Sequence, residues 1–441
     1  MGRFCGSWSI RLTELSVDLL STHASCTEFR LKHCFQLGQL GILGNEMHRI
    51  ASSPALQPPG WVVWALAGGG AVSVGFSRFG YGLILPSMQQ SFGWSYAQAG
   101  LLNTFNAVGY LCGALFAALL ISRLGNRRLL AIGLVVTELS LLLSGFAHTL
   151  EVLSVLRFTA GVGAAWIFIT GGVLASTLGT RAIAVFFSGA GVGMTMTGAT
   201  LPWIFHSYGN AAWPYAWGVV AVMCLPMCAV GFAALRHLSE PQIKASSSRT
   251  TWRPSNLRLS MAAYTLFGVG YIPYMTFIVA WLRENPTGLG FAVTSSAVWC
   301  ILGVATLVAP KLWGKSLAQD VNGSTLALAL FTNAIGVTLA MLVPGVAGVA
   351  ISAFVFGCSL FTVPSAMGTL VKSQAPSQAW GKTMSTFTIA FAAGQVVGPI
   401  LAGWIGDISH SLTIGLAASA GMLGLAGVFA CLQYLQLRNA H

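Results

Sequence analysis

Acidic side chains are scarce in this sequence: only 10 of the 441 residues are Asp or Glu, and charged residues of both signs make up 7%. A soluble protein carries about 25% charged residues, so this chain cannot cover a water-exposed surface with polar groups. Hydrophobic residues instead make up 55% of the sequence. The composition therefore predicts a polytopic membrane protein and argues against a soluble enzyme or binding module.

The sequence also lacks the motifs of common catalytic and metal centres. Its nine cysteines show no Cys-x-x-Cys or Cys/His ligand spacing, so we interpret them as small core residues and expect no metal site. There is no Walker loop, no His-Glu-x-x-His and no Gly-x-Ser-x-Gly motif. Ser77 follows a glycine at i−2, but no histidine lies centrally in an apolar segment to activate it. We expect neither an enzyme nor a bound cofactor.

Long apolar segments account for most of the chain beyond residue 60. A membrane-crossing helix needs roughly 20 apolar residues, and this criterion predicts twelve spans joined by mostly short loops. The predicted spans are 61–87, 97–121, 129–147, 151–174, 182–204, 212–235, 259–282, 292–313, 324–342, 346–370, 383–405 and 412–435. We therefore expect an all-α membrane fold.

One longer loop, 236–258, divides the twelve predicted spans six and six. The expected organisation is thus an N-terminal six-helix bundle at 61–235 and a C-terminal six-helix bundle at 259–435. The last residues, 436–441, form a short cytoplasmic tail in this interpretation. The loops leave no room for a catalytic domain outside the membrane.

Residues 1–46 differ from the rest of the chain. They hold four of the ten acidic residues and no apolar run long enough for a signal peptide, and Gly6 stands where a myristoylation motif needs Ser or Thr. One interpretation is a disordered cytoplasmic extension. The other, which we favour, is non-native sequence upstream of a start at Met47, with 47–60 as the cytoplasmic lead.

Lys and Arg are unevenly distributed between the two sides of the predicted spans. If the chain starts inside, Arg283 is the one such residue in an outer loop. The inner segments contain Arg49, Arg123, Arg127, Arg128, Arg181, Arg236, Lys244, Arg249, Arg253, Arg258, Lys311, Lys315, Lys372, Lys382 and Arg438. The positive-inside rule therefore predicts an inner-membrane protein with both termini in the cytoplasm. It also accounts for the net charge of +12 without a nucleic-acid partner, and we expect a monomer in the lipid bilayer.

The two halves show weak internal similarity. "GFSRFGY" at 75–81 matches "GVGYIPY" at 268–274, which places Arg78 opposite Tyr271 and Tyr81 opposite Tyr274. Basic loops follow the second span of each half, and the fifth span of each half is rich in glycine. Internal repeats of this kind are typical of transporter folds.

Twelve spans in two halves, with a basic loop after the second, resemble the major facilitator superfamily. The loop "SRLGNRR" at 122–128 keeps Arg123, Gly125, Arg127 and Arg128 of the superfamily's loop motif. Ser122 replaces the acidic residue that, by resemblance, helps latch the inner gate. The resemblance implies that this loop takes part in gating, without the usual ion pair.

Two further stretches resemble this superfamily. In the fourth span, "LRFTAGVGAA" at 156–165 is similar to its arginine-containing motif. Residues 75–117 resemble the first helix pair of the YbfB-like branch. The features shared with that branch are Gly75, Arg78, Phe79, Tyr81, Pro86, Gly100, Asn106, Gly109, Tyr110 and Gly113. The resemblance implies a transporter of the major-facilitator fold and does not imply a substrate.

Arg78 is the strongest functional signal in the chain. A charge at this depth in a span costs roughly 3 kcal/mol on insertion scales. Ala71, Gly75 and Gly82 share its face on an α-helix, so Arg78 should face protein or a cavity rather than lipid. We interpret it as the binding group for an anionic solute or as part of a proton-linked ion pair. Capping of a broken helix is the structural alternative.

Other polar residues inside the spans are candidates for the same site. The predicted solute-binding set is Arg78, Tyr81, Asn106, Arg157, Tyr271, Tyr274 and Gln395. For each neighbour of Arg78, interhelical hydrogen bonding is an equally good interpretation, and Arg157 could instead snorkel to the membrane surface. Glu138 is the one carboxylate near a span midpoint, where burial disfavours the charged form and suits reversible proton binding. Its alternative role is a bond to a neighbouring helix.

The sequence thus predicts a secondary active transporter that moves a small organic solute by alternating access, coupled to a proton gradient. An organic anion is the expected solute if both arginines face the cavity. Efflux of an amphipathic drug-like or neutral solute is the competing transport function. A non-transporting membrane sensor is the competing class, although the sequence contains no attached signalling domain.

Overall fold

The computed structural model describes residues 59–240 and 254–439. The extension expected at 1–46, the lead up to residue 58 and most of the central loop lie outside these described residues. Within them every regular element is helical, and residues from Pro59 onward form one compact unit. The predicted all-α fold is confirmed.

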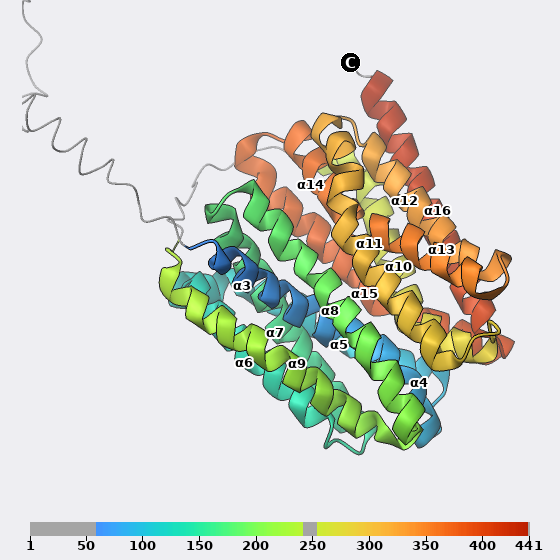
Figure 1. The fold of residues 1–441 in the computed structure, drawn as a ribbon. Helices are drawn as coiled ribbons and strands as arrows, with labels where there is room; N and C mark the ends of the chain where they lie inside the picture. Colours follow the sequence, from blue (N-terminus) through green and yellow to red (C-terminus); the bar gives the residue numbers. More distant parts are fainter. Residues whose placement is uncertain (1–58, 241–253, 440–441) are drawn as a thin grey trace, which may run out of the picture. The chain divides into compact units, whose positions relative to one another are not determined.

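The first half of the described chain contains six long helices or helix series, shown in blue to yellow-green in Figure 1. The first span is continuous through α3 (Trp61–Gly70), η2 (Ala71–Phe79) and α4 (Gly80–Phe92), and is followed by α5 (Tyr96–Leu124), α6 (Asn126–Ser144), α7 (Leu150–Thr177), α8 (Thr180–Tyr208) and α9 (Trp213–Ala234). Short polar caps separate some of them: Ser95 and Gln98 form a reciprocal capping box at the start of α5. Compact caps of this kind allow antiparallel neighbours to be joined by short loops.

The second half repeats this plan. It contains α10 (Arg258–Glu284), α11 (Phe291–Gln319), α12 (Ser324–Leu342), the broken pair α13 (Gly345–Leu360) and α14 (Thr362–Gln374), α15 (Trp380–Ser409) and α16 (Leu412–Asn439). Among the described residues, eleven of the twelve helices or helix series are long and apolar enough to cross a membrane. The remaining one, α6, carries Arg127, Arg128 and Glu138 within 19 residues.

Two matching glycine crossings show that the halves are pseudo-symmetric. In the first half, a Cβ on Gly75 would lie 2.7 Å from the carbonyl oxygen of Ala190 and from Gly193 Cα on α8. In the second half, a Cβ on Gly268 would clash with α15 beside Gly394. These contacts join the first and fifth spans of each half at positions that the sequence repeat aligns. Glycine permits this close approach of two helix backbones.

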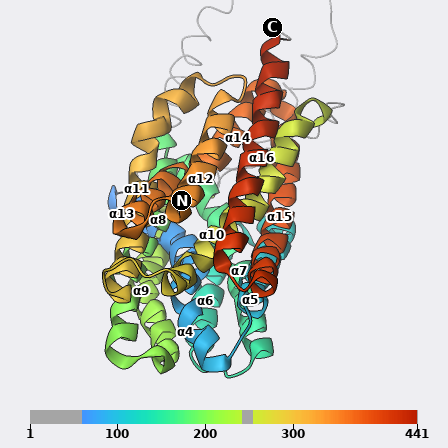
Figure 2. The same cartoon turned by 90° about the vertical axis from the view of Figure 1, so that its right-hand side faces the viewer.

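The helices place their basic residues at one end of the described unit, which we call the basic end. It contains Arg123, Arg127, Arg128, Arg181, Arg236, Arg258, Lys311, Lys315, Lys372, Lys382 and Arg438. The opposite end contains the turn after α4 and the C-terminus of α10, with Arg283 as its one Lys or Arg in the described ranges. In Figure 2 the C-terminus of α16 marks the basic end at the top, and α4 reaches the opposite end at the bottom.

Candidate functional site

Arg78 lies near the end of a π-helix in the first span. The π-helical segment Ala71–Phe79 is buried along its whole length and runs directly into α4 at Gly80. Hydrogen bonds in a π-helix close five residues apart instead of four, and such segments often mark functional sites. The wider turn also changes which face each later residue occupies.

The prediction that Ala71, Gly75, Arg78 and Gly82 share one helix face is wrong because of this widened turn. Gly75 packs on α8 of its own half, whereas a Cβ on Gly82 would meet Trp299 and the carbonyl oxygen of Met275 in the second half. The sequence-based face assumed the α-helical period, which η2 interrupts. Arg78 and Gly82 therefore face the second half and Gly75 does not.

The Arg78 side chain crosses between the two halves. Its Nη2 donates to Gln395 Oε1 on α15 at 2.8 Å, and the Gln395 amide donates in turn to the hydroxyl of Tyr271 on α10. Its guanidinium lies over the ring of Tyr110 at 5.4 Å. The Arg78 side chain is 7% exposed, and its Nε has no hydrogen-bond partner among the described residues. Its charge is therefore held by neutral groups only.

A cavity of about 280 Å³ lies next to this hydrogen-bonded trio. Its lining consists of Val74, Arg78, Phe79, Tyr110, Phe168, Phe187, Tyr264, Phe267, Tyr271, Leu360, Phe361, Pro364, Ser365, Met384, Thr388, Phe391 and Gln395. Arg78 is the one charged residue in this lining, and more than half of the other lining residues are aromatic. The cavity thus combines one cationic group with largely apolar walls.

The second half contributes a continuous aromatic wall, which we define as Tyr264, Phe267, Tyr271 and Phe391. Phe267 stacks on Tyr271 at a centroid distance of 4.7 Å, and Tyr264 stacks on Phe391 at 4.6 Å. Phe267 and Tyr271 also lie within 11° of parallel to Phe391. Near-parallel rings present a flat apolar surface on which another planar group can stack.

The cavity extends from Arg78 toward the basic end. Gln395 and Arg78 are buried at its inner limit, whereas Met384, in the first two turns of α15, is half-buried and Ser365 on α14 is exposed. Exposure therefore rises along the cavity in that direction. A solute at Arg78 would be approached from the basic end.

Contacts between the halves close the opposite end. The carboxylate of Asp407, near the end of α15, accepts from the backbone N–H groups of Tyr96 and Ala97 at 2.7 and 2.9 Å. Arg283, near the end of α10, donates to Asn210 Oδ1 at 2.7 Å and to Ser87 Oγ at 3.2 Å. Asp407 thus caps the N-terminus of α5, where negative charge is favoured. These bonds tie α10 and α15 to the first half.

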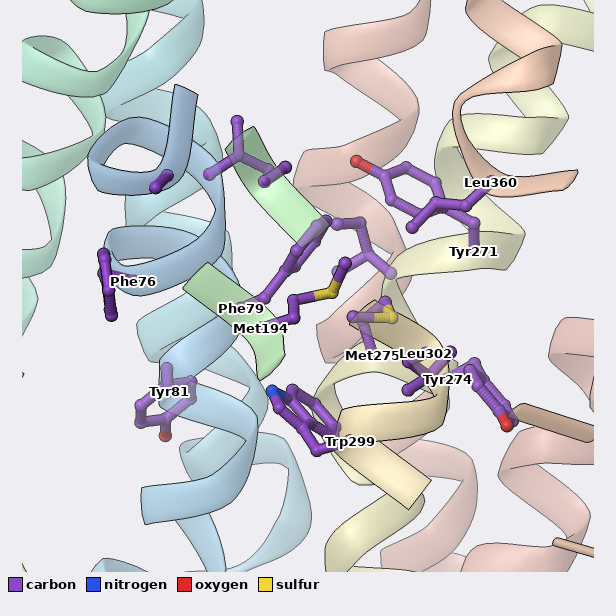
Figure 3. Packing of buried hydrophobic residues seen from close by; sticks show 14 of the residues in the cluster. Phe76, Phe79, Tyr81, Met194, Tyr271, Tyr274, Met275, Trp299, Leu302 and Leu360 are labelled. Carbon is purple, nitrogen blue, oxygen red and sulfur yellow. The ribbon is translucent and has the colours of Figure 1, made fainter. Parts of the chain in front are cut away.

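Large apolar side chains fill the space between the cavity and this closed end. Trp299 of α11 is fully buried and packs against Gly82 and Gly198 of the first half. Figure 3 shows Trp299, Met275, Met194 and Phe79 between the first span and α10. Their packing separates Arg78 from the opposite end.

Four predicted site residues do not line this cavity. The amide of Asn106 donates to the backbone oxygen of Arg157 at 3.1 Å, and Arg157 Nη1 donates to the backbone oxygen of Ser77 at 2.6 Å. The Tyr81 hydroxyl donates to the backbone oxygen of Ala99, and the Tyr274 hydroxyl pairs with Ser352. The structure therefore brings together Arg78, Tyr271 and Gln395, and places the other four in contacts between helices.

Arg157 is buried and does not snorkel. Its side chain is 1% exposed, and its guanidinium lies 5.1 Å from the ring centre of Tyr81 and 5.6 Å from that of Trp217. The proposed route to the membrane surface is wrong, because these rings and the Ser77 carbonyl hold the side chain inside the first half.

Glu138 is not part of the cavity lining. It is half-buried on α6, and its Oε2 accepts from the thiol of Cys228 on α9 at 3.9 Å. The structure thus places it between two helices of the first half. Its role in proton coupling stays a prediction.

The predicted gating loop is held by a carboxylate that sequence reasoning did not identify. Glu240, just after α9, accepts from the backbone N–H groups of Asn126 and Arg127 at 3.0 and 2.7 Å. Gly125 adopts a positive φ of 80° at this turn, which favours glycine. Arg123 and Arg128 are exposed on either side. Glu240 thus supplies a carboxylate to the loop in which Ser122 replaces the acidic residue.

Of the aromatic wall, Tyr271 was predicted as a site residue, whereas Tyr264, Phe267 and Phe391 were missed, as was Tyr110. Tyr264, Phe267 and Tyr271 recur at spacings of three and four residues, which marks one face of a helix, and this periodicity could have found them. Phe391 lies one turn before Gln395 on α15. In a sequence that is 11% aromatic, such residues do not stand out from those that face lipid.

Comparisons with known proteins agree with this architecture. A profile of the family described as "Uncharacterised MFS-type transporter YbfB" matches residues 70–431. The inner membrane transport protein YdhP of Escherichia coli K12 is 26% identical over 345 residues, which covers 75% of this chain and 86% of YdhP. The gallate transporter of Pseudomonas putida is 30% identical over 187 residues, covering 40% of this chain and 41% of that protein.

Solved structures show the same fold at lower identity. The crystal structure of a D-xylose–proton symporter superposes with a TM-score of 0.67 at 15% identity, covering 86% of this chain and 97% of the symporter. At this identity the likeness concerns the fold alone. The family match extends through both halves of the described unit, and both relatives are named as transport proteins, YdhP of the inner membrane. The chain therefore belongs to the YbfB-type family of the major facilitator superfamily of membrane transporters.

Proposed function

We propose that this transporter moves a small organic anion, and that Arg78 binds its carboxylate. The observation that carries the proposal is a cavity whose one charged residue, Arg78, contacts no carboxylate among the described residues. A buried guanidinium held only by neutral groups gains most from an anionic partner, because charge-assisted bidentate bonds are stronger than neutral ones. The solute carboxylate would replace or extend the bond to Gln395.

The walls favour a solute with a flat apolar body. The stacked rings of Tyr264, Phe267, Tyr271 and Phe391 offer a surface for an aromatic ring beside the cationic group. Pockets for drug-sized ligands measure about 300–1,000 Å³, so a cavity of about 280 Å³ suits a single-ring acid. The relative named as a gallate transporter also acts on an aromatic carboxylate, which agrees with this substrate class.

The same arrangement supports a proposed orientation and mechanism. The positive-inside rule supports placing the basic end in the cytoplasm, so the cavity would be reached from the cytoplasm in the described state. Alternating access would then require the bonds of Asp407 and Arg283 at the opposite end to break while the basic end closes. We propose proton coupling for this cycle, with Glu138 as the candidate carrier.

Transport by the purified protein in liposomes tests the proposal. The solutes are benzoate, its neutral analogue benzamide, and cyclohexanecarboxylate, which keeps the charge without an aromatic ring. Counterflow, in which unlabelled solute inside drives entry of labelled solute, needs no ion gradient and isolates binding and exchange. A second series with an imposed pH gradient measures coupling. We expect benzoate to exchange faster than either analogue.

The outcomes separate the competing functions. Equal exchange of benzamide and benzoate would contradict an anion site and favour a neutral or drug-like solute. Thermal stabilisation by benzoate without any counterflow would favour a sensor. Lys382→Gln serves as the control variant, because Lys382 is an exposed basic residue on α15 outside the cavity lining. Its exchange of benzoate should match that of the wild type.

A further inference from the structure

Arg157 is a second buried arginine whose position the cavity does not explain. It lies on α7, is fully buried, and does not line the cavity next to Arg78. Its Nε and Nη2 have no hydrogen-bond partner among the described residues. The one hydrogen bond its guanidinium makes there goes to the backbone oxygen of Ser77. The role of Arg157 therefore depends on what the Ser77 carbonyl and its peptide group position in the first span.

Ser77 directly precedes Arg78 within the π-helix. Arg157 Nη1 lies 2.6 Å from the Ser77 oxygen. π-Helical segments are rare, and helices change direction at π-bulges or where a side chain or water enters the hydrogen-bond ladder. The neighbouring residue on the chain, Arg78, reaches the other half through Gln395. Any movement of the Ser77 peptide therefore moves the backbone from which Arg78 projects.

The guanidinium of Arg157 is itself held in place by its surroundings. Tyr81 and Trp217 present ring faces to it, at 5.1 and 5.6 Å, and these contacts stabilise a cation without a carboxylate. The amide of Asn106 bonds the backbone oxygen of Arg157. One turn further on, α7 packs directly against the backbone of α5. The contact is so close that a Cβ on Gly161 would clash with the backbone of Asn106. Because its neighbours hold the Arg157 guanidinium in place, its hydrogen bond to Ser77 can fix the position of the π-helix backbone.

We propose that Arg157 is a positioning residue: by its bond to the Ser77 carbonyl it holds the π-helical turn in the conformation that directs Arg78 toward Gln395 and the cavity. It acts on the solute through Arg78 and does not touch the solute. This inference rests on the proposed anion site for its functional consequence, but its structural part can be measured on the protein without any solute.

The structural part is tested by amide hydrogen exchange in detergent, followed in peptides that span residues 71–85. Arg157→Met removes the charge and the donor, and Arg157→Lys retains both in a different geometry. Ser140→Ala is the control, because Ser140 is also buried and bonds Thr159 of α7. We expect Arg157→Met to raise exchange in 71–85 at least fivefold, Arg157→Lys to raise it less, and Ser140→Ala to leave it unchanged. Unchanged exchange in Arg157→Met would overturn the proposal.

The functional part is tested by the KM for benzoate counterflow in a double-variant cycle. Arg157→Met should raise the KM about tenfold, with partial recovery in Arg157→Lys. In an Arg78→Ala background the same substitution should add less than twofold, because residues that act through one another are not additive. An equal effect in both backgrounds would mean that Arg157 acts on the solute by its own charge, which contradicts the proposal. If the wild-type protein shows no counterflow of benzoate, the proposed function is wrong. The amide hydrogen exchange of residues 71–85 then still decides whether Arg157 is a positioning residue.

Discussion

The first spans of the two halves occupy equivalent positions but carry different functional side chains. Both are buried along most of their length, and both carry a glycine that packs on the fifth span of the same half, Gly75 on α8 and Gly268 on α15. Three residues after these glycines, the first half has Arg78 in a π-helix and the second half has Tyr271 in an α-helix. Packing is therefore conserved between the halves of this chain while the chemistry is not.

The difference shows what a charge requires of its helix. The three members of the aromatic wall on α10 need only the α-helical period, since Tyr264, Phe267 and Tyr271 fall on one face. Arg78 is accompanied by a widened turn, a bond from Arg157 to the preceding carbonyl, and a neutral acceptor from the other half. The α10 part of the aromatic wall is built by periodicity alone, whereas Arg78 depends on contacts from two further helices, α7 and α15.

Among the variants considered, removing the Arg78 charge should have the largest effect on transport. We expect Arg78→Ala to lower the kcat/KM for benzoate about 100-fold, since losing one partner of a buried charge-assisted bond costs about 2–5 kcal/mol. Exchange of benzamide should change less than threefold. The measurement is counterflow of both solutes in liposomes. A parallel loss for both solutes would show that Arg78 supports the fold or the exchange step and does not select anions.

The shared packing should respond equally in both halves. Gly75→Val and Gly268→Val each force a side chain into a helix crossing where a Cβ already has no room. Overpacking of this kind costs about 1–3 kcal/mol, so both variants should lower the thermal unfolding midpoint by similar amounts. Fluorescence-monitored unfolding in detergent gives the comparison. A drop confined to one variant would show that the two crossings are not equivalent.

The aromatic wall should give a smaller and selective effect. Tyr271→Phe keeps the stacked ring but removes the acceptor of the Gln395 amide, so the KM for benzoate should rise about fivefold, as expected for one hydrogen bond of about 1 kcal/mol. Tyr274→Phe is the matched change one turn away, where the hydroxyl bonds Ser352 outside the cavity lining. Its KM should change less than twofold. Equal effects would place both hydroxyls in the solute site.

Glu138 should give the smallest effect on exchange. Because it lies outside the cavity lining, beside Cys228, Glu138→Gln should change counterflow less than twofold. If it carries the coupling proton, the same variant should lose the stimulation of uptake by a pH gradient. Retained stimulation would remove Glu138 from the coupling mechanism.

The fold was predictable because hydropathy, loop charge and internal similarity all report on long segments. The burial of Arg78 also followed from the high cost of placing a charge in lipid. Its partner could not be derived: Gln395 lies 317 residues away, and no local pattern relates the two. The π-helix was missed because Arg78 marks "AVSVGFSRF" as unusual but no residue in it specifies a change in the helical hydrogen-bond pattern.

The other polar residues show why the site was predicted only in part. Asn106, Tyr81 and Tyr274 have the same composition-based signal as Gln395, since each is a polar group within a span. The structure gives the first three backbone or side-chain partners between helices and gives Gln395 to Arg78. Whether such a group bonds a neighbouring helix or faces a cavity depends on helix rotation, which hydropathy does not specify.

The most direct measurement is a structure of the protein with 4-bromobenzoate bound, in which anomalous scattering locates the bromine. The account predicts the carboxylate at the guanidinium of Arg78 and the bromine over the aromatic wall of Tyr264, Phe267, Tyr271 and Phe391, with the bromine peak absent in Arg78→Ala. A bromine peak elsewhere in the protein, or an unchanged peak in Arg78→Ala, would contradict the assignment of Arg78 as the anion-binding residue.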